Sequence, residues 1–546
     1  MLASQGHDFT IPEETVRIAK KAFRKGNPHI TLRDELGILY EDNEFATLFS
    51  SQGKPAASPG YLAMVTAMQY MEGVSDRQAA DNVRGRIDWK YALGLPLDDA
   101  GFDASILSEF RSRLIAGNVE MRLLERLLEI CQAHNLLTAR GQQRTDSSHV
   151  LGAVREINRL ELVAETLRHA LNSLANTVPA WLAGQVPASW FDAYGARLDA
   201  YRFPESKSAR QELAETIGRD GYALWQMVQH ADAPAWLPEL PAVEILRRIW
   251  VQNFYLEGAQ VRLRSAENGP PGALRIQSPY DVEVRYSRKR QTEWVGYKVH
   301  LTETCEPELP HLITHVHTTP SSEPDQNAIK PIHQALADKQ LLPATHIVDT
   351  GYIDAENLAD SQVDHQVDLV GPAPPDTSWQ AQSPTAFDLS TFAVDWDAQP
   401  VTCPAGAQSR VWSISQDRSH PVIHVQFHKT TCLACPFRTQ CTTASKGPRT
   451  LKLRAKAEHI ALQDARQRQT LPAFKQLYST RAGVEGTISL GARSFDLRRA
   501  RYIGLAKTHL QQLCSAIAIN LSRLAAWFQG HTVATTRISA FASLSP

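Results

Sequence analysis

The pattern of apolar and polar positions predicts two long helical regions. From residue 59 to residue 136 apolar side chains recur at helical spacing, as in NVEMRLLERLLEI, whose leucines share one face. Residues 155–265 show the same spacing, for example in the amphipathic INRLELVAETLRHALNSL. Near the C-terminus, IGLAKTHLQQLCSAIAINLSRLAAWF predicts one long helix with an apolar face. Helices therefore make up much of the fold.

Strand patterns lie between and after these helical regions. Gln142 to Val150 predicts a strand that ends at Asp146, and WVGYKVHLTE alternates with the period of two that is typical of strands. HLITHVHTTP predicts its antiparallel partner. A helix is predicted over residues 323–338, the apolar run before Asp349 fits a short buried strand, and QVDLVGP predicts another. These strands and helices together predict an α/β fold.

Three acidic residues are candidates for a metal site. Asp146 and Asp349 each follow a predicted strand, which is where α/β sheets place ligands. Glu485 comes one helical turn after Arg481, in the segment 478–511 that holds six Lys/Arg against two acids. An acid beside a basic surface suits an enzyme that holds metal against a phosphate backbone. The alternatives are a turn aspartate that bonds its own backbone at Asp146, and a plain (i, i+4) ion pair at Arg481.

Basic residues of the same segment predict contacts with DNA phosphates. Arg498, Arg499 and Arg501 cannot all reach base edges, because they lie within four residues of one another. The alternative is a solvated helix face, or pairing with Asp496 inside the protein. Four arginines of the N-terminal helices could also contact DNA or could form a solvated face: Arg77, Arg84, Arg111 and Arg113. The DNA-contact candidates of the C-terminal segment are Tyr478, Arg481, Arg493, Arg498, Arg499, Arg501 and Lys507.

Composition limits the class of protein. The 546 residues are enough for three or four domains, and 43% of them are apolar, so a sizeable core is expected. The net charge of −1 gives no overall attraction to nucleic acid, so DNA binding would depend on local basic clusters. The start, MLASQGHDF, shows no signal-peptide pattern, and no apolar run reaches the ~18 residues that span a bilayer. A cytoplasmic protein is expected.

Cysteine spacing predicts a metal site rather than disulfides. Seven cysteines is an odd number, and four of them lie late in the chain around one C-x-x-C pair. Such a pair with two flanking cysteines can supply four thiolates to a tetrahedral zinc ion. The alternative is reduced cysteines without a ligand. The candidate zinc ligands are Cys403, Cys432, Cys435 and Cys441, with His424 and His428 as substitutes.

Several motifs together resemble bacterial insertion-sequence transposases of the Asp-Asp-Glu type, most closely the group numbered eleven-eighty-two. They are TDSSHV, HIVDTGY and RAGVEGTISLGARSFDLRRARYIGLAKTHLQ, with DWKYALGL, SEFRSRL, WVGYKVHLTE, CPAG and CLACPFRTQC. The similarity runs from about residue 30 to residue 528. It implies a ribonuclease-H-like core with Asp146 on the first strand, Asp349 on the fourth and Glu485 on a later helix.

The resemblance also implies a Tyr, Arg, Glu, Lys/Arg signature around the last acid. Tyr478, Arg481 and Glu485 fit it, whereas the basic residue expected at position 492 appears as Arg493. Three residues near the second core strand are additional candidates for the site: Asp281, as a fourth acid, Lys298 and His300.

Pattern and resemblance together predict the following organisation. An N-terminal helical, DNA-binding domain (1–136) comes first. Ribonuclease-H-like core strands (137–155 and 270–371) follow and enclose a helical insertion (156–269). After them come a cysteine-rich insertion (372–460), the C-terminal part of the core with the Glu485 helix (461–528) and a disordered tail (529–546).

The expected function is DNA transposition. The enzyme would bind the terminal inverted repeats of its element, cleave the strands and transfer them to target DNA, using two Mg²⁺ or Mn²⁺ ions held by Asp146, Asp349 and Glu485. Converging carboxylates should raise at least one pKa in the metal-free site. The expected partner is double-stranded DNA, bound by a homodimer in the cytoplasm at the bacterial nucleoid. The alternatives are a metal-dependent nuclease without joining activity, and a transposase-derived DNA-binding regulator.

Overall fold

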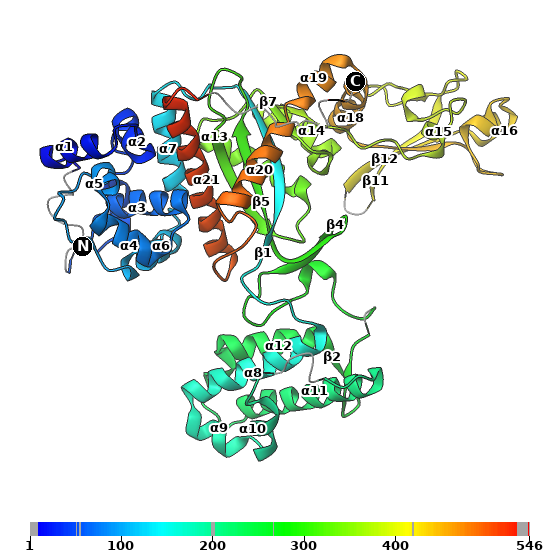
Figure 1. The fold of residues 1–546 in the computed structure, drawn as a ribbon. Coiled ribbons are helices and arrows are strands. Elements are labelled where there is room, and N and C mark those ends of the chain that lie inside the picture. Colours follow the sequence, from blue (N-terminus) through cyan, green and yellow to red (C-terminus); the bar gives the residue numbers. More distant parts are fainter. Residues whose placement is uncertain are drawn as a thin grey trace.

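A six-stranded mixed sheet lies at the centre of the molecule in this computed structural model (Figure 1). The structure describes residues 9–50, 52–53, 56–197, 203–265, 267–417, 420–531 and 544. The strand order is β4-β5-β1-β7-β8, and β6 also pairs with β5. The strands are β1 (Gln142–Leu151), β4 (Arg285–Lys289), β5 (Thr292–Thr304), β6 (Ile313–Pro320), β7 (Thr345–Val348) and β8 (Asp368–Val370).

Strand directions divide this sheet into two halves. β5 pairs antiparallel with β1 and with β6. β7 instead runs parallel to β1, and β8 runs parallel to β7. The predicted antiparallel partner of β5 is therefore confirmed, as are the short strands at β7 and β8. The prediction that the first strand ends at Asp146 was wrong. β1 continues to Leu151 because its residues Ser147 to Leu151 keep pairing with the long strand β5.

The predicted N-terminal helices pack against the sheet through α21 (Leu505–Phe528), which lies between them and β6. One hydrophobic cluster joins Leu62 and Phe110 of the N-terminal helices with Val316 of the sheet and Ile517 of α21. Burial of these apolar side chains holds the two parts together. The N-terminal helices are α1 (Glu13–Ala22), α2 (Pro28–Leu36), η1 (Asp42–Leu48), α3 (Pro59–Glu72), α4 (Asp76–Gly85), α5 (Ile87–Leu93), α6 (Ser105–Ala116) and α7 (Arg122–Ala133).

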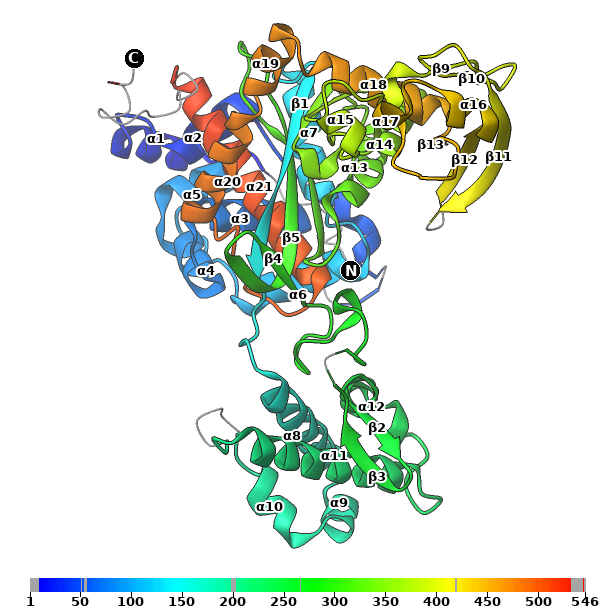
Figure 2. The same ribbon diagram turned by 90° about the vertical axis from the view of Figure 1, so that its right-hand side faces the viewer.

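A separate helical module lies below the sheet in Figures 1 and 2, and it has its own hydrophobic cluster. Its helices are α8 (Arg159–Thr177), α9 (Pro179–Gln185), α10 (Ala188–Tyr194), α11 (Lys207–Gln229), η3 (Leu237–Glu239) and α12 (Pro241–Asn253). Helical spacing was predicted throughout residues 155–265, and for FYLEG, residues 254–258, that prediction was wrong. Those residues form the hairpin of β2 (Phe254–Glu257) and β3 (Gln260–Leu263), because Gly258 turns the chain at φ 63° and β-forming aromatic residues precede it.

The cysteine-bearing segment forms a third lobe at the far edge of the molecule (Figure 2). A three-stranded sheet of order β11-β12-β13 supports it, and a small apolar cluster fills it. Its elements are α15 (Trp379–Gln382), η7 (Leu389–Thr391), β9 (Ala393–Val394), β10 (Val401–Thr402), β11 (Ser409–Asp417), β12 (His420–Phe427), α16 (Lys429–Ala434), α17 (Arg438–Cys441) and β13 (Thr450–Leu453).

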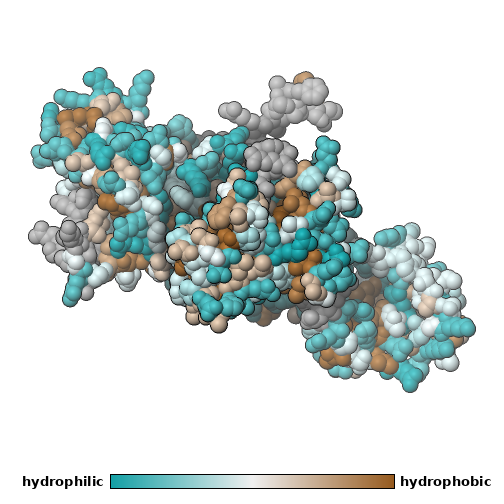
Figure 3. All heavy atoms as spheres, turned by 90° about the horizontal axis from the view of Figure 1, so that it is seen from below, coloured by the Kyte–Doolittle hydropathy of each residue, from teal (hydrophilic) through white to brown (hydrophobic). Residues whose placement is uncertain are grey.

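The remaining helices complete the layers around the sheet. They are η4 (Gly272–Leu274), η5 (Asp325–Ala328), α13 (Ile329–Asp338), η6 (Thr350–Tyr352), α14 (Ala355–His365), α18 (Lys456–Arg468), α19 (Pro472–Ser479) and α20 (Ala482–Ser494). Seen from below, hydrophilic side chains spread over the face of the molecule between smaller apolar areas (Figure 3). No helix among the described residues is long and apolar enough to cross a membrane. Most of the predicted tail, residues 532–543 and 545–546, lies outside the described part of the chain.

Candidate active site

The two candidate aspartates lie at one level on neighbouring strands. β1 and β7 run parallel, and their register pairs Thr145 with Val348. Asp146 and Asp349 are the next residues along each strand, so the pairing brings them to the same edge of the sheet. Both line one open pocket of about 980 Å³.

Helix α20 brings Glu485 to the same pocket. The helix packs on β1 and β5, and its backbone comes very close to the sheet at Gly483. A Cβ at that position would lie 2.2 Å from a guanidinium nitrogen of Arg144, so a glycine is required for this approach. The carboxylate of Glu485 is 61% exposed and lines the pocket together with Asp146 and Asp349.

Arg481 connects two of these acids. Its Nη1 donates to Oδ2 of Asp146 at 2.9 Å, and its Nη2 donates to Oε1 of Glu485 at 2.9 Å. Its Nε donates to the hydroxyl of Tyr478 at 3.2 Å. The expected (i, i+4) ion pair is therefore present, and the same guanidinium also reaches across to β1. It supplies positive charge between the two carboxylates.

Burial raises the pKa of the Asp146 carboxyl above its ordinary value, and Arg481 opposes that shift. The direction agrees with the expectation of a raised pKa in the metal-free site. The cause differs, because desolvation and not repulsion from the other carboxylates dominates. Burial therefore makes the ionised form of Asp146 costly, and the ion pair with Arg481 offsets only part of that cost.

Asp325 is a fourth acid in the pocket that sequence reasoning missed. Its Oδ1 accepts a hydrogen bond from Nζ of Lys298 at 2.7 Å, and its Oδ2 accepts one from Oγ of Ser147 at 3.1 Å. Although burial opposes it, Lys298 lowers the pKa of Asp325 below its ordinary value. In the sequence, Asp325 looks like a turn residue in SSEPDQ, so only the fold reveals its position.

Two other candidates near the second core strand, Asp281 and His300, make hydrogen bonds with residues other than the candidate acids. Asp281 does not line the pocket; its carboxylate accepts hydrogen bonds from the hydroxyl of Tyr297 at 2.9 and 2.8 Å and from the amide of Gly504 at 3.1 Å. His300 is buried, with Nδ1 2.7 Å from the hydroxyl of Tyr352, and burial lowers its pKa to about 3. It is therefore neutral at neutral pH.

The basic residues after Glu485 fall into three groups. Arg498 lines the pocket, and its Nε donates to Oγ of Ser148 at 3.0 Å. Arg501 instead pairs with Asp496 at 2.7 Å and lies over the ring of Tyr70, which agrees with the alternative of internal pairing. The other three are exposed outside the pocket: Arg493, Arg499 and Lys507.

A basic hairpin tip, also missed from the sequence, borders the pocket. Arg288, Lys289 and Arg290 lie where β4 turns into β5, and all three are among the lining residues. Lys289 is close enough to lower the pKa of Asp146. The signal was present as the run SRKRQ between two strand patterns.

The N-terminal arginines are mostly engaged inside the protein. Arg111 pairs with Asp76 at 2.5 Å, Arg84 pairs with Asp81 at 2.9 Å, and Arg113 pairs with Glu109 on its own helix. These pairs reduce the number of free positive charges that this region presents. Arg77 is exposed.

Oxygen ligands on the walls of the pocket suit a hard divalent cation such as Mg²⁺. Its three candidate acids do not form a compact ligand set, because among the described residues the only three metal-ligating groups within 4.8 Å of one another are His29, Glu72 and Asp88. That cluster already holds Arg86, which pairs with both acids. In the pocket, the guanidinium of Arg481 bridges Asp146 and Glu485.

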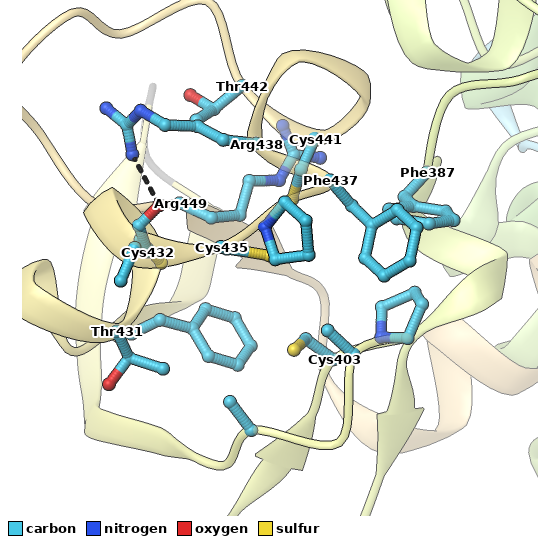
Figure 4. A pocket seen from close by; sticks show the side chains of 16 residues that line it. Phe387, Cys403, Thr431, Cys432, Cys435, Phe437, Arg438, Cys441, Thr442 and Arg449 are labelled. Carbon is cyan, nitrogen blue, oxygen red and sulfur yellow. Dashed lines mark hydrogen bonds between the residues drawn. The ribbon is translucent and has the colours of Figure 1, made fainter.

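The four candidate zinc ligands lie together in the third lobe, away from these acids. Cys403, Cys432, Cys435 and Cys441 line one pocket of about 330 Å³ (Figure 4). His424 and His428 are not among its lining residues. All four cysteines are free thiols and half-buried.

Comparison with known families links both ends of the chain to transposition. Residues 402–525 match the family model described as a transposase DDE domain, and residues 20–113 match the one described as a transposase domain (DUF772). The first match contains Glu485 but not Asp146 or Asp349. A search of curated proteins found no match. In these two segments the chain is similar to transposase domains.

Proposed function

We propose that this protein is a DNA transposase whose metal site consists of Asp146, Asp349 and Glu485. The observation that carries the proposal is that β1, the end of β7 and α20, which lie far apart in the sequence, bring these carboxylates to one pocket. In chain order the strands of the central sheet are β1, β4, β5, β6, β7 and β8; β4 is an edge strand that pairs with the start of β5, and the other five form the proposed core. Asp146 then lies on the first and Asp349 directly after the fourth, which supports a ribonuclease-H-like core.

Divalent ions, when bound, supply the positive charge that activates the attacking oxygen and stabilises the leaving one during phosphoryl transfer. Asp146 and Asp349 lie at one sheet edge and line one pocket, so the same two residues could bind a shared ion. Glu485 is exposed on its helix and can turn toward them. Asp146, Asp349 and Glu485 would hold the ions, and Arg481, which now contacts two of these carboxylates, could then hold a phosphate oxygen.

The rim of the pocket supports DNA as the partner. Arg288, Lys289, Arg290 and Arg498 line the same pocket as the acids, so positive charge accompanies them there. Such charges attract the phosphate backbone without reading sequence. The proposal has five further parts. The protein belongs to the insertion-sequence group eleven-eighty-two, binds the terminal inverted repeats of its element and uses two ions per site. It acts as a homodimer on DNA, at the nucleoid in the bacterial cytoplasm.

A labelled terminal-repeat duplex with target DNA and MgCl₂ tests this function. The wild-type protein should yield cut and joined products. Asp146→Asn, Asp349→Asn and Glu485→Gln should each abolish both while the DNA still shifts in a gel, because each removes a ligand charge with little change in shape. Glu244→Gln, an exposed acid on α12 in the separate helical module, is the matched control and should keep wild-type activity.

The outcomes separate the alternatives. Cut product without joined product identifies a metal-dependent nuclease. A gel shift without any cleavage identifies a DNA-binding regulator. Wild-type cleavage by any one of the three variants removes that residue from the site.

A further inference from the structure

We propose that Cys403, Cys432, Cys435 and Cys441 bind one structural zinc ion, independently of the transposase site. The four thiols come from three separate pieces of backbone and border the same pocket (Figure 4). Cys403 follows β10, Cys432 and Cys435 lie at the end of α16, and Cys441 ends α17. Four of the seven cysteines of the chain thus border one pocket, which is not expected of thiols without a shared role.

Tight turns present the cysteines as zinc sites require. At Cys403 the chain reverses at once: its amide donates to the carbonyl of Ala407 at 2.8 Å, and the amide of Gly406 donates to the carbonyl of Cys403 at 2.8 Å. Gly406 adopts a φ of 82° there, which favours glycine. On the other wall, the amide of Arg438 donates to the carbonyl of Cys435 at 3.2 Å and closes the turn after the C-x-x-C pair.

The surroundings of the thiols suit a tetrathiolate ion. Two arginines line the pocket and can offset its negative charge: Arg438, whose Nη1 donates to the carbonyl of Cys432 at 3.1 Å, and Arg449. The Nε of Arg449 is buried and has no hydrogen-bond partner in the described part of the chain, and a neighbouring thiolate would supply one.

Metal binding would close the pocket. Tetrahedral zinc with Zn–S bonds of about 2.3 Å requires sulfurs about 3.8 Å apart. No three of the four sulfurs lie within 4.8 Å of one another, so the cysteine side chains must turn inward for zinc to bind. The 330 Å³ between them leaves room for that movement. Each thiol that binds gives its proton to solvent, and the ion links β10, α16 and α17.

Stability is the main consequence, because the lobe has a small apolar core. Six buried apolar residues form its cluster, and Cys403, Cys432 and Cys441 pack against it. A core of this size needs a further constraint, and a structural metal is a common one. The zinc ion would therefore maintain the lobe and would not take part in the chemistry at Asp146.

Metal content of the purified full-length protein tests the proposal. We expect about one zinc per chain by mass spectrometry. Cys432→Ala and Cys435→Ala should each lose most of this zinc, whereas Cys131→Ala, which removes a buried thiol of α7, should keep it. Replacement of the zinc by cobalt in the wild-type protein should give the charge-transfer and d–d bands of a tetrahedral thiolate site, whether or not the variants fold.

Other results would overturn the zinc site. They are a folded wild-type protein without zinc that takes up neither zinc nor cobalt from solution, equal zinc loss in Cys131→Ala, or cobalt bands without thiolate charge transfer. If zinc binds at the cysteines, Asp146→Asn should leave the zinc content unchanged. Zinc loss in that variant would place the ion at the acids instead, so this experiment fails separately from the transposase proposal.

Discussion

At the scale of single residues, Arg481 is the central group of the candidate site. Its guanidinium contacts Asp146, Glu485 and the hydroxyl of Tyr478, so one side chain holds acids from β1 and α20 together. Bidentate or bridging guanidinium contacts of this kind are stronger than neutral hydrogen bonds. Arg481 thereby fixes the positions of Asp146 and Glu485 relative to each other in the metal-free site.

Magnesium should stabilise the folded protein through Asp146. The folded-state pKa of this carboxyl is raised, so its contribution to the free energy of unfolding falls as pH rises from about 3.9 through the raised value. Metal bound to the ionised acid offsets that loss. At about 100 times the dissociation constant, MgCl₂ should add about 2.7 kcal/mol at neutral pH and little at acid pH. Denaturant unfolding with and without MgCl₂ measures this.

Asp146→Asn is the control for that experiment, since it removes both the titrating group and a metal ligand. Its response to MgCl₂ should be small at every pH. An equal gain in the variant and in the wild-type protein would show that magnesium binds elsewhere.

Asp325 should act as a positioning residue for the metal site. It links Lys298 on β5 to Ser147, the neighbour of Asp146, and it does so inside the pocket. Under the proposed function, Asp325→Asn should weaken metal affinity by about 10–100-fold, as loss of a supporting carboxylate typically does. The Mg²⁺ concentration at half-maximal cleavage measures the change.

Asp360→Asn provides the comparison, because Asp360 also pairs with a lysine, at 2.8 Å from Lys330, but on the exposed face of α14. It should leave the magnesium dependence unchanged. If Asp325→Asn also leaves it unchanged and only destabilises the fold, Asp325 is a structural residue.

At the scale of elements, the seating of α20 on the sheet decides whether Glu485 reaches the aspartates. Arg144 of β1 pairs with the fully buried Glu303 at 2.6 Å, and Glu303 also pairs with Arg523 of α21 and accepts a hydrogen bond from Thr487 of α20. This buried network ties both C-terminal helices to β1 and β5. Each charge within it has a partner, as burial requires.

Gly483→Ala should disturb this seating. The new methyl group would meet the guanidinium of Arg144 at 2.2 Å, so the free energy of unfolding should fall by about 1–3 kcal/mol, as for other overpacked sites. Thermal or denaturant unfolding measures it. Gly486→Ala on the same helix has nothing within 4 Å of the added carbon and should be neutral or stabilising by about 0.5–1 kcal/mol. Equal effects of the two substitutions would mean that α20 does not depend on this contact.

At the scale of the whole molecule, three hydrophobic clusters correspond to the central body, the lower helical module and the cysteine-bearing lobe (Figure 1). The candidate site belongs to the central body, where the basic hairpin tip and Arg498 flank it. The net charge of −1 is therefore a poor guide to DNA affinity, because the arrangement of charges matters more than their sum.

Salt dependence should reveal which arginines contact the DNA. Arg498→Gln should reduce the slope of log affinity against log salt by ~0.9 on duplex DNA, equally on terminal-repeat and random sequences. Arg501→Gln should leave the slope unchanged, because Arg501 already pairs with Asp496. Equilibrium binding over a salt series measures both. A loss confined to terminal repeats would assign base reading to Arg498, and an unchanged slope would place the DNA path elsewhere.

The sequence by itself determined the elements that local chemistry decides. Period-two alternation identified β5 and its antiparallel partner β6, and helical spacing identified the N-terminal helices and α21, because these patterns depend on neighbours a few residues apart. Motif spacing also selected Asp146, Asp349, Glu485 and the four clustered cysteines as candidates, and the structure brings each set to one pocket.

Only the tertiary structure decided how those residues are used. The far end of β1 is a strand because β5 pairs with it, and no local pattern shows that partner. Asp325 enters the pocket, Asp281 is held by Tyr297 and Gly504, and Arg501 pairs internally, although in the sequence all three are simply charged residues near the expected site. Asp325 and Asp281 acquire these roles from contacts with distant segments, at Ser147 and Gly504, which a linear pattern does not contain. Arg501 pairs with Asp496 only five residues away, and the structure decided between that pairing and a contact with DNA that the sequence had left open.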